Sequence, residues 1–205
     1  SIYNGLDFTP RTPAMNRAEY LRSVGLEADE TCVVAGIAAR LNPVKDIATL
    51  IRGFAKAHRA FPALRLLIAG DGEEMANLKQ LAADLGVAKA VCFAGWISDT
   101  DSFYNALDIN TLTSISETFP YALTEGARAG LPTISSKVGG VSYLIDHGSN
   151  GFLFPPGEDQ ALADHLLTLA RDPDLRKTMG QRLYEKAKNA TKDAVKSTKE
   201  RSKLR

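Results

Sequence analysis

Short apolar runs alternate with amphipathic segments along most of the chain. The runs that we expect to form strands lie at residues 32–38, 64–69, 91–94, 109–113, 132–135 and 152–154. Segments with the three-to-four-residue spacing of helices lie at residues 17–23, 47–59, 74–85, 102–107, 140–145, 162–170 and 175–187, and a further helix opens at residue 120. This alternation predicts βαβ units and a parallel sheet. Right-handed crossovers then make a doubly wound, Rossmann-like α/β fold of about six strands the expected fold class.

The chain divides into three parts by its periodicity. Residues 1–30 are weakly periodic and are punctuated by Pro10 and Pro13, so we expect a leading segment outside the sheet. Residues 31–187 carry the strand and helix pattern and form the expected globular domain. Residues 188–205 are rich in Lys and Arg and poor in apolar positions, and we expect this basic tail to be frayed or disordered.

Composition narrows the class of protein. The 205 residues are 44% hydrophobic and carry a net charge of +1, which suits one globular domain with a substantial core. The near-neutral balance argues against a dedicated nucleic-acid binder. The sequence has no apolar run of about 18 residues and opens without the charged and apolar pattern of a signal peptide, so we expect a cytoplasmic protein. Peripheral association of the full-length protein with the inner membrane face stays open.

Two cations follow the first predicted strand. Arg40 and Lys45 lie in the loop after Ala38, and Asp46 stands where it can cap the next helix. A guanidinium offers a planar fork to phosphate oxygens and an ammonium offers a point charge, so the pair suits a diphosphate at a strand-to-helix turn. Taken alone, the two side chains fit solvated surface cations slightly better than a phosphate site.

Two carboxylates flank the turn after the fourth predicted strand. Glu117 lies on the loop and Glu125 lies inside the helix that opens at Pro120, in an E-x7-E arrangement. Pro120 suits the first helical position, because an N–H there would have no partner within the helix. Open α/β sheets bind ligands at the carboxyl ends of their strands, and a helix N-terminus favours an anion such as phosphate. The alternative is a solvated loop residue at Glu117 and an ordinary helix-surface residue at Glu125.

Two further motifs favour neither dinucleotide nor metal chemistry. Gly70-Asp71-Gly72 follows the second strand, but Met75 stands where a G-x-G-x-x-G fingerprint needs glycine. Asp99-Thr100-Asp101 formally matches a D-x-D metal motif, although an N-cap for the short helix that follows is the better interpretation. We therefore assign no metal.

These motifs, in this order, resemble those of the group 1 glycosyltransferases (glycosyltransferase family 4), which have the GT-B fold. Arg40 and Lys45 are similar to the family's G-R-[LF]-x4-K motif, and the two carboxylates to its E-x7-E motif. Weaker resemblances to the V-G-x-G, F-x-G-x-V, D-x-G-G, N-G-x-L-x-x-P-G and N-G-V-D motifs lie at residues 69–72, 93–97, 137–140, 150–157 and 4–7. The resemblance covers roughly residues 3–187 and identifies the chain as the C-terminal, donor-binding half of a GT-B fold.

The resemblance implies transfer of a sugar from a nucleoside-diphosphate sugar with retention of configuration. The catalytic roles fall on Arg40, Lys45 and Glu117, with the cations neutralising the diphosphate and Glu117 holding sugar hydroxyls. Glu125 is then the ribose ligand, and the backbone at Ile97 meets the nucleobase. The donor-binding residues implied are Arg40, Lys45, Ile97, Glu117, Thr118, Phe119, Pro120, Leu123 and Glu125.

The same resemblance implies no cofactor and no metal, with the nucleotide sugar as the substrate. The acceptor, which could be a saccharide, a lipid-linked molecule or a small molecule, would bind on an N-terminal domain to which residues 1–30 form the junction. We expect no nucleic-acid partner. We also expect the isolated chain to bind nucleotide and to transfer sugar poorly or not at all.

Some alternatives stay open at this point. Thr118 stands where relatives often carry glycine, and it would be strained if that position needs a positive φ. A sugar-nucleotide epimerase of the same architecture and a nucleotide-binding regulatory module without catalysis are the rival functions. The nucleotide (UDP, GDP or ADP), the sugar, the acceptor and the oligomeric state are also left open.

Overall fold

A computed structural model describes residues 7–9 and 11–204 and contains one sheet of parallel strands. The strands are β1 (Val33–Ala38), β2 (Leu64–Ala69), β3 (Val91–Gly95), β4 (Ile109–Leu112), β5 (Thr133–Ser136) and β6 (Gly151–Phe154). Their order in the sheet is β3-β2-β1-β4-β5-β6, and all the pairings are parallel. The predicted doubly wound, Rossmann-like α/β fold is confirmed.

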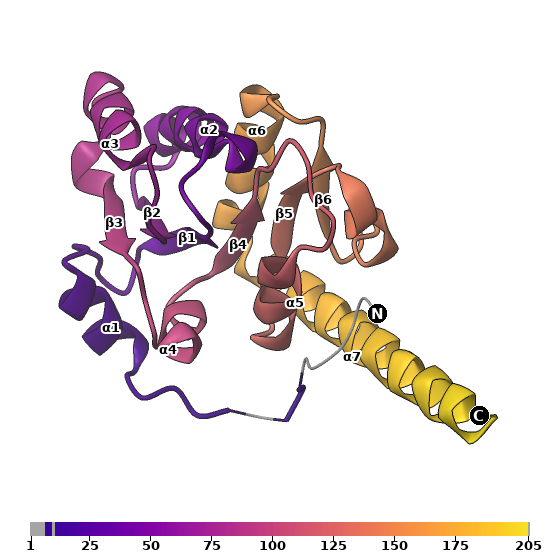
Figure 1. The fold of residues 1–205 in the computed structure, drawn as a ribbon. Helices are drawn as coiled ribbons and strands as arrows, with labels where there is room; N and C mark the ends of the chain where they lie inside the picture. Colours follow the sequence, from indigo (N-terminus) through magenta and orange to yellow (C-terminus); the bar gives the residue numbers. More distant parts are fainter. Residues whose placement is uncertain (1–6, 10, 205) are drawn as a thin grey trace.

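Helices cover both faces of this sheet (Figure 1). They are α1 (Arg17–Val24), α2 (Ile47–Ala60), α3 (Met75–Asp84), α4 (Thr100–Asn105), α5 (Tyr121–Arg128), α6 (Asp159–Arg171) and α7 (Pro173–Lys203), with 3₁₀ turns η1 (Pro43–Lys45), η2 (Ala88–Ala90) and η3 (Gly139–Tyr143). Helices α2, α3 and α6 pack on one face, and α1, α4 and α5 pack on the other. Helix α7 contributes Met179 to the first face and Leu183 to the second. Every predicted strand and helix has a counterpart in the structure, although the helix predicted at residues 140–145 is the 3₁₀ turn η3.

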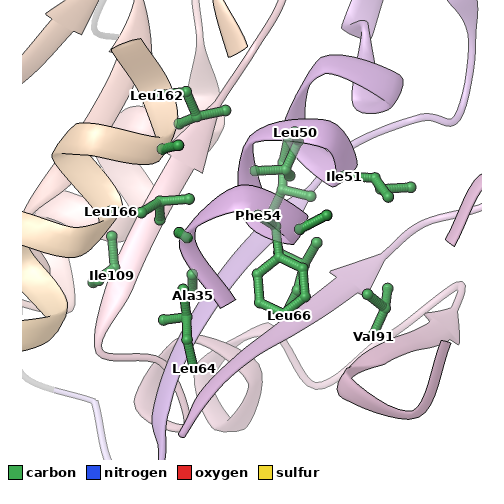
Figure 2. Close-up of a cluster of buried hydrophobic side chains, with 14 of the residues drawn as sticks. Ala35, Leu50, Ile51, Phe54, Leu64, Leu66, Val91, Ile109, Leu162 and Leu166 are labelled. Carbon is green, nitrogen blue, oxygen red and sulfur yellow. The ribbon is translucent and has the colours of Figure 1, made fainter. Parts of the chain in front are cut away.

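Alternation along the central strands supplies both apolar layers. In β1, Ala35 contributes to the cluster under α2 and α6. Val34, which precedes it, contributes to the cluster under α1 and α4, because successive side chains of a strand point to opposite faces. Figure 2 shows the first cluster, in which Phe54 of α2 and Leu166 of α6 point toward the strands. Phe54 and Leu166 are fully buried, so this layer fixes the positions of the strand ends that carry the functional loops.

The order in which successive strands join the sheet reverses between β1 and β4. Ala35 pairs with Ile109 and Gly36 with Asn110, so two strands that are far apart in sequence lie side by side. The connection after β1 leads toward β2 and that after β4 leads toward β5, on opposite sides of this junction. The loops that follow the two strands therefore diverge and leave a crevice, the usual ligand site of such a sheet.

The structure corrects the predicted tail. Residues 188–203 continue α7 as a regular helix instead of fraying, and Figure 1 shows this helix extending beyond the sheet. The segment contains no Gly or Pro, and Lys196 stands three positions after Asp193 and four before Glu200, spacings at which opposite charges support a helix. Our prediction relied on the basic composition and undervalued this helix propensity.

A smaller correction concerns the opening of α5. Pro120 is the N-cap residue with an extended backbone (φ −84°, ψ 91°), and the helix begins one residue later at Tyr121. The N-G-V-D-like segment at residues 4–7 lies outside the described residues apart from Asp7.

Candidate functional site

The loops after β1 and β4 are tied together above the crevice. The Ile115 N–H donates a hydrogen bond to the Val44 carbonyl (2.9 Å), and the Thr113 hydroxyl donates one to the Lys45 carbonyl (2.8 Å). Beside this connection lies a pocket of about 280 Å³. Its walls come from Ile37, Ala38, Ala39, Arg40, Lys45, Leu112, Ser114, Glu117, Phe119, Pro120, Tyr121 and Ala122. The structure thus brings Arg40, Lys45, Glu117, Phe119 and Pro120 together as the sequence predicted.

The turn after β2 supports the backbone around Arg40. The Leu41 N–H donates to the Asp71 carbonyl (2.9 Å), and the Glu74 N–H donates to the Leu41 carbonyl (3.0 Å). Gly70 has a φ of +132°, and a Cβ there would lie 1.8 Å from the Ala39 carbonyl oxygen. Only glycine allows this approach, so Gly70 serves the shape of the loop. The Arg40 side chain is exposed and forms no ion pair with any residue that the structure describes.

Lys45 ends the short turn η1. The Asn42 side chain accepts a hydrogen bond from the Lys45 N–H (3.2 Å), which fixes the turn. Asp46 occupies the N-cap position of α2 as predicted, in a left-handed conformation (φ 46°, ψ 48°) that Asp tolerates. Its carboxylate accepts a hydrogen bond from the Thr49 hydroxyl (2.7 Å), and makes no side-chain cap to a backbone amide.

Lys45 and Glu117 form an ion pair inside the pocket. The Lys45 Nζ lies 2.5 Å from Glu117 Oε1, and the Ser114 hydroxyl donates to the same oxygen (2.9 Å). The Glu117 side chain is 11% exposed, so the pair lies at the wall of the pocket and not in free solvent. Such a pair holds a cation where it can meet an anionic ligand, beside a carboxylate that can accept hydrogen bonds from hydroxyls.

The turn after β5 presses against the backbone of Glu117. Gly139 has a φ of +49°, and a Cβ there would lie 1.9 Å from the Glu117 carbonyl oxygen. Because a side chain cannot fit this approach, Gly139 fixes the loop that carries Glu117. The sequence predicted a glycine turn at this point but not its contact with the carboxylate loop.

Asn110 is a positioning residue that the sequence analysis missed. It is fully buried in β4, and its Nδ2 donates a hydrogen bond to the Ala122 carbonyl in the first turn of α5 (3.0 Å). Tyr121 and Ala122 line the pocket, so this bond holds the N-terminus of α5, with its outward N–H groups, at the pocket wall. The sequence signal that could have identified it is an Asn inside an otherwise apolar strand pattern.

Other predicted donor-binding residues lie elsewhere. Leu123 is fully buried in the cluster between α5 and α7, which leaves only its backbone for a ligand. Ile97 is half-buried and packs against the cluster beneath α1 and α4. Thr118 is exposed and unstrained, since Asp46 is the only non-glycine residue with a positive φ in the described part of the chain.

Glu125 lines a separate cavity of about 270 Å³, and it is absent from the walls of the pocket that holds Glu117. Its Oε2 lies 2.5 Å from Nη2 of Arg128, which follows it by three positions on α5. An opposite charge three residues after a helical Glu was a signal for this pair that the sequence analysis did not use. The ribose role of Glu125 stays a prediction.

The D-x-D sequence serves the fold. Asp99 caps α4 by accepting a hydrogen bond from the Ser102 N–H (3.1 Å), as expected. Asp101 faces Arg128, at 3.4 Å between Oδ1 and Nη2. Within residues 7–9 and 11–204, His, Cys, Asp and Glu form no group of three or more that could hold a metal ion.

The described helices include none that is both long enough and apolar enough to cross a membrane.

Residues 23–186 match the family of glycosyl transferases group 1. N-acetyl-alpha-D-glucosaminyl L-malate synthase of Bacillus anthracis is 29% identical over 90% of this chain and 48% of its own length. The lipopolysaccharide core biosynthesis glycosyltransferase LpsE of Rhizobium meliloti is 32% identical over 86% of this chain and 49% of its own length. The chain spans about half the length of these relatives.

Solved structures agree with this match. Anabaena HepE, crystallised in complex with UDP and glucose, has a TM-score of 0.84 and 27% identity over 96% of this chain and 55% of HepE. The C-terminal domain of LpcC, a group 1 glycosyl transferase of Francisella tularensis, has a TM-score of 0.79 and 25% identity, and the match covers 90% of this chain and 97% of that domain. The chain therefore belongs to the group 1 glycosyl transferases and has the fold of their C-terminal domain.

Proposed function

We propose that this chain binds the donor of a retaining glycosyltransferase, a nucleoside-diphosphate sugar. The observation that carries the proposal is the Lys45–Glu117 pair, which lies beside Arg40 at the junction of β1 and β4. Cations for a diphosphate and a carboxylate for sugar hydroxyls stand next to one another in one pocket. Retention of configuration rests on the family resemblance.

The proposed chemistry is stabilisation of the departing nucleoside diphosphate. The bond between the anomeric carbon and the phosphate oxygen breaks, and its electron pair passes to the diphosphate. The acceptor hydroxyl oxygen bonds to the anomeric carbon, and its proton passes to the departing diphosphate. Arg40, Lys45 and the N-terminus of α5 would offset the charge that develops on the diphosphate, in the role that a metal has elsewhere. Neither a metal nor a cofactor is part of the proposal.

The comparisons support UDP as the first nucleotide to test. HepE was crystallised with UDP-glucose, and its structure is 28% identical to this chain with a TM-score of 0.84. The remaining donor-binding roles are carried over as proposals: the ribose to Glu125, the nucleobase to the backbone at Ile97, and backbone contacts to Thr118 and Leu123.

In our proposal, the acceptor binds to a part of the protein that lies outside this chain. Because the chain spans about half of its relatives, we propose that a second domain binds the acceptor and that the isolated chain binds nucleotide without appreciable transfer. Turnover of an activated sugar by the isolated chain at an ordinary enzyme rate would contradict this division of labour.

The test of the proposed function is Glu117→Ala in the full-length protein, with transfer from a UDP-sugar as the readout. A transferase should lose most of its turnover, since the carboxylate that holds the sugar is gone. A nucleotide-binding regulatory module would transfer no sugar, with or without the substitution. A sugar-nucleotide epimerase would show itself by changing the configuration of the donor sugar in the absence of any acceptor.

A further inference from the structure

A second cluster of charges lies between α4 and α5, centred on Arg128. The Arg128 side chain is only 9% exposed, and its Nη2 lies 2.5 Å from Glu125 Oε2 and 3.4 Å from Asp101 Oδ1. One guanidinium thus joins a carboxylate of α5 to a carboxylate of α4. A planar fork is suited to such a double contact, and an arginine so little exposed is costly unless it is paired.

Glu125 and Arg128 border one cavity. The other walls of this cavity include Tyr104 of α4, Tyr184 of α7 and the N-terminal segment at Phe8 and Thr9. Burial and the nearby charge of Glu125 raise the pKa of the Tyr104 hydroxyl, so this ring stays neutral beside the carboxylate. Within the described residues, Arg128 is the hydrogen-bond and ion-pair partner of the Glu125 carboxylate.

Glu125 also lies next to the donor pocket along the helix. It follows Tyr121 by four positions and Ala122 by three, and both of those residues line the pocket. Residues at these spacings share one face of a helix. Arg128 contacts Oε2 of Glu125, whereas Oε1 forms no hydrogen bond with any residue in the described part of the chain. One carboxylate oxygen is thus held and the other is left for a ligand hydroxyl.

We propose that Arg128 is a positioning residue that holds Glu125 for the ribose hydroxyls of the donor and so makes the site discriminate ribonucleotides from their deoxy analogues. This role rests on the proposed function, since it needs a nucleotide in the pocket. A carboxylate held by an ion pair loses less side-chain freedom when it binds than a free one does. Arg128 thereby acts on the ribose part of the affinity and not on the diphosphate part.

The experiment compares the affinities of UDP and 2′,3′-dideoxy-UDP for this chain by titration calorimetry. We expect wild type to prefer UDP by roughly 10- to 100-fold, the factor of a hydrogen bond to a charged group. Glu125→Gln and Arg128→Met should each reduce that ratio severalfold and leave the dideoxy-UDP affinity unchanged, and the double variant should resemble Glu125→Gln alone. Arg182→Met is the matched control, because Arg182 is exposed and, among the described residues, hydrogen-bonds only to the Ser149 carbonyl (3.3 Å).

Arg128→Lys keeps a charge beside Glu125 but cannot also reach Asp101 with a fork, so an intermediate ratio is expected, and this variant serves if Arg128→Met does not fold. An unchanged ratio in a folded Arg128 variant would overturn the positioning role while the proposed function stands. Equal affinity of wild type for both nucleotides would overturn it as well, since Glu125 would then not contact the ribose. Binding of neither nucleotide by wild type would overturn the proposed function and this role with it.

Discussion

Lys45 and Glu117 are 72 positions apart in the sequence, and their charged atoms lie 2.5 Å apart in the structure. Lys45 ends the turn after β1, and Glu117 lies in the loop after β4. The two strands are neighbours because the order of the sheet reverses between them. The chemistry of the pocket is therefore a direct product of the sheet topology.

The two members of this pair should contribute differently to donor binding. Lys45→Met removes a positive charge from the diphosphate site, so we expect the affinities for UDP and UDP-glucose to fall alike, by roughly 10-fold or more. Glu117→Gln removes a sugar ligand and also a negative charge near the phosphates. It should leave UDP affinity equal or higher and weaken UDP-glucose relative to UDP. Calorimetric titration of both ligands measures this split.

Ser116→Ala is the matched control for the pair, since Ser116 is exposed on the same loop and lines no part of the pocket. Equal losses of UDP affinity in Lys45→Met and Glu117→Gln would show that the two side chains do not divide phosphate and sugar between them.

Gly139 should be needed for both folding and binding. Gly139→Ala places a Cβ 1.9 Å from the Glu117 carbonyl oxygen at a φ of +49°, so the loop must move. We expect a loss of unfolding free energy of roughly 3 kcal/mol or more, together with weaker binding of UDP-glucose. Urea denaturation and calorimetry measure the two effects.

Gly148 offers the control for backbone strain alone. It has a φ of +83°, and no atom lies within 4 Å of the position that a Cβ would take, so Gly148→Ala should cost only about 1–2 kcal/mol and leave binding unchanged. If the two alanine variants lost equal stability and both bound normally, the close packing of Gly139 against the Glu117 loop would be wrong.

Stability should fall in mild acid through His165. Burial, and then the nearby His147, lower the pKa of His165 from its usual value of 6.5. The unfolded chain therefore binds the proton more readily than the folded one. The contribution of this residue to stability is complete above about pH 6.5 and is lost as the pH falls through the lower pKa of the folded state.

The His165 ring stacks on Phe152, with centroids 4.5 Å apart, so His165→Phe keeps the ring contact and removes the titration. We expect the urea midpoint of wild type to drop between pH 7.5 and pH 5.5 by more than that of His165→Phe. Identical pH dependence in the two proteins would show that His165 does not control the acid sensitivity.

The sequence predicted the strands, the helices and the order in which the functional loops follow them, because apolar periodicity is a local signal. It also predicted Arg40, Lys45 and Glu117 as one site, since the carboxyl ends of parallel strands share one edge. The sequence could not predict contacts between residues of distant elements. The Asn110 bond to Ala122 and the Gly139 contact with Glu117 depend on how closely elements pack, which no local pattern encodes.

Charge patterns were harder to interpret than apolar ones. The basic tail was predicted to fray, although its lack of Gly and Pro allowed α7 to run to Lys203. Glu125 was predicted as a ligand from its spacing to Glu117, whereas its pairing with Arg128 depends on which rotamer the surrounding helices allow. Composition alone cannot separate a solvated charge from a paired one.

Donor binding by the pocket at the junction of β1 and β4 is tested most directly by titrating UDP, GDP, ADP and NAD into this chain and into Arg40→Ala, with Arg59→Ala, an exposed arginine of α2, as the control. We expect one diphosphate, with UDP foremost, to bind wild type and Arg59→Ala alike and to bind Arg40→Ala roughly 10- to 100-fold more weakly. Binding of NAD alone, or a UDP affinity that is unchanged in Arg40→Ala, would contradict a diphosphate site at this edge of the sheet.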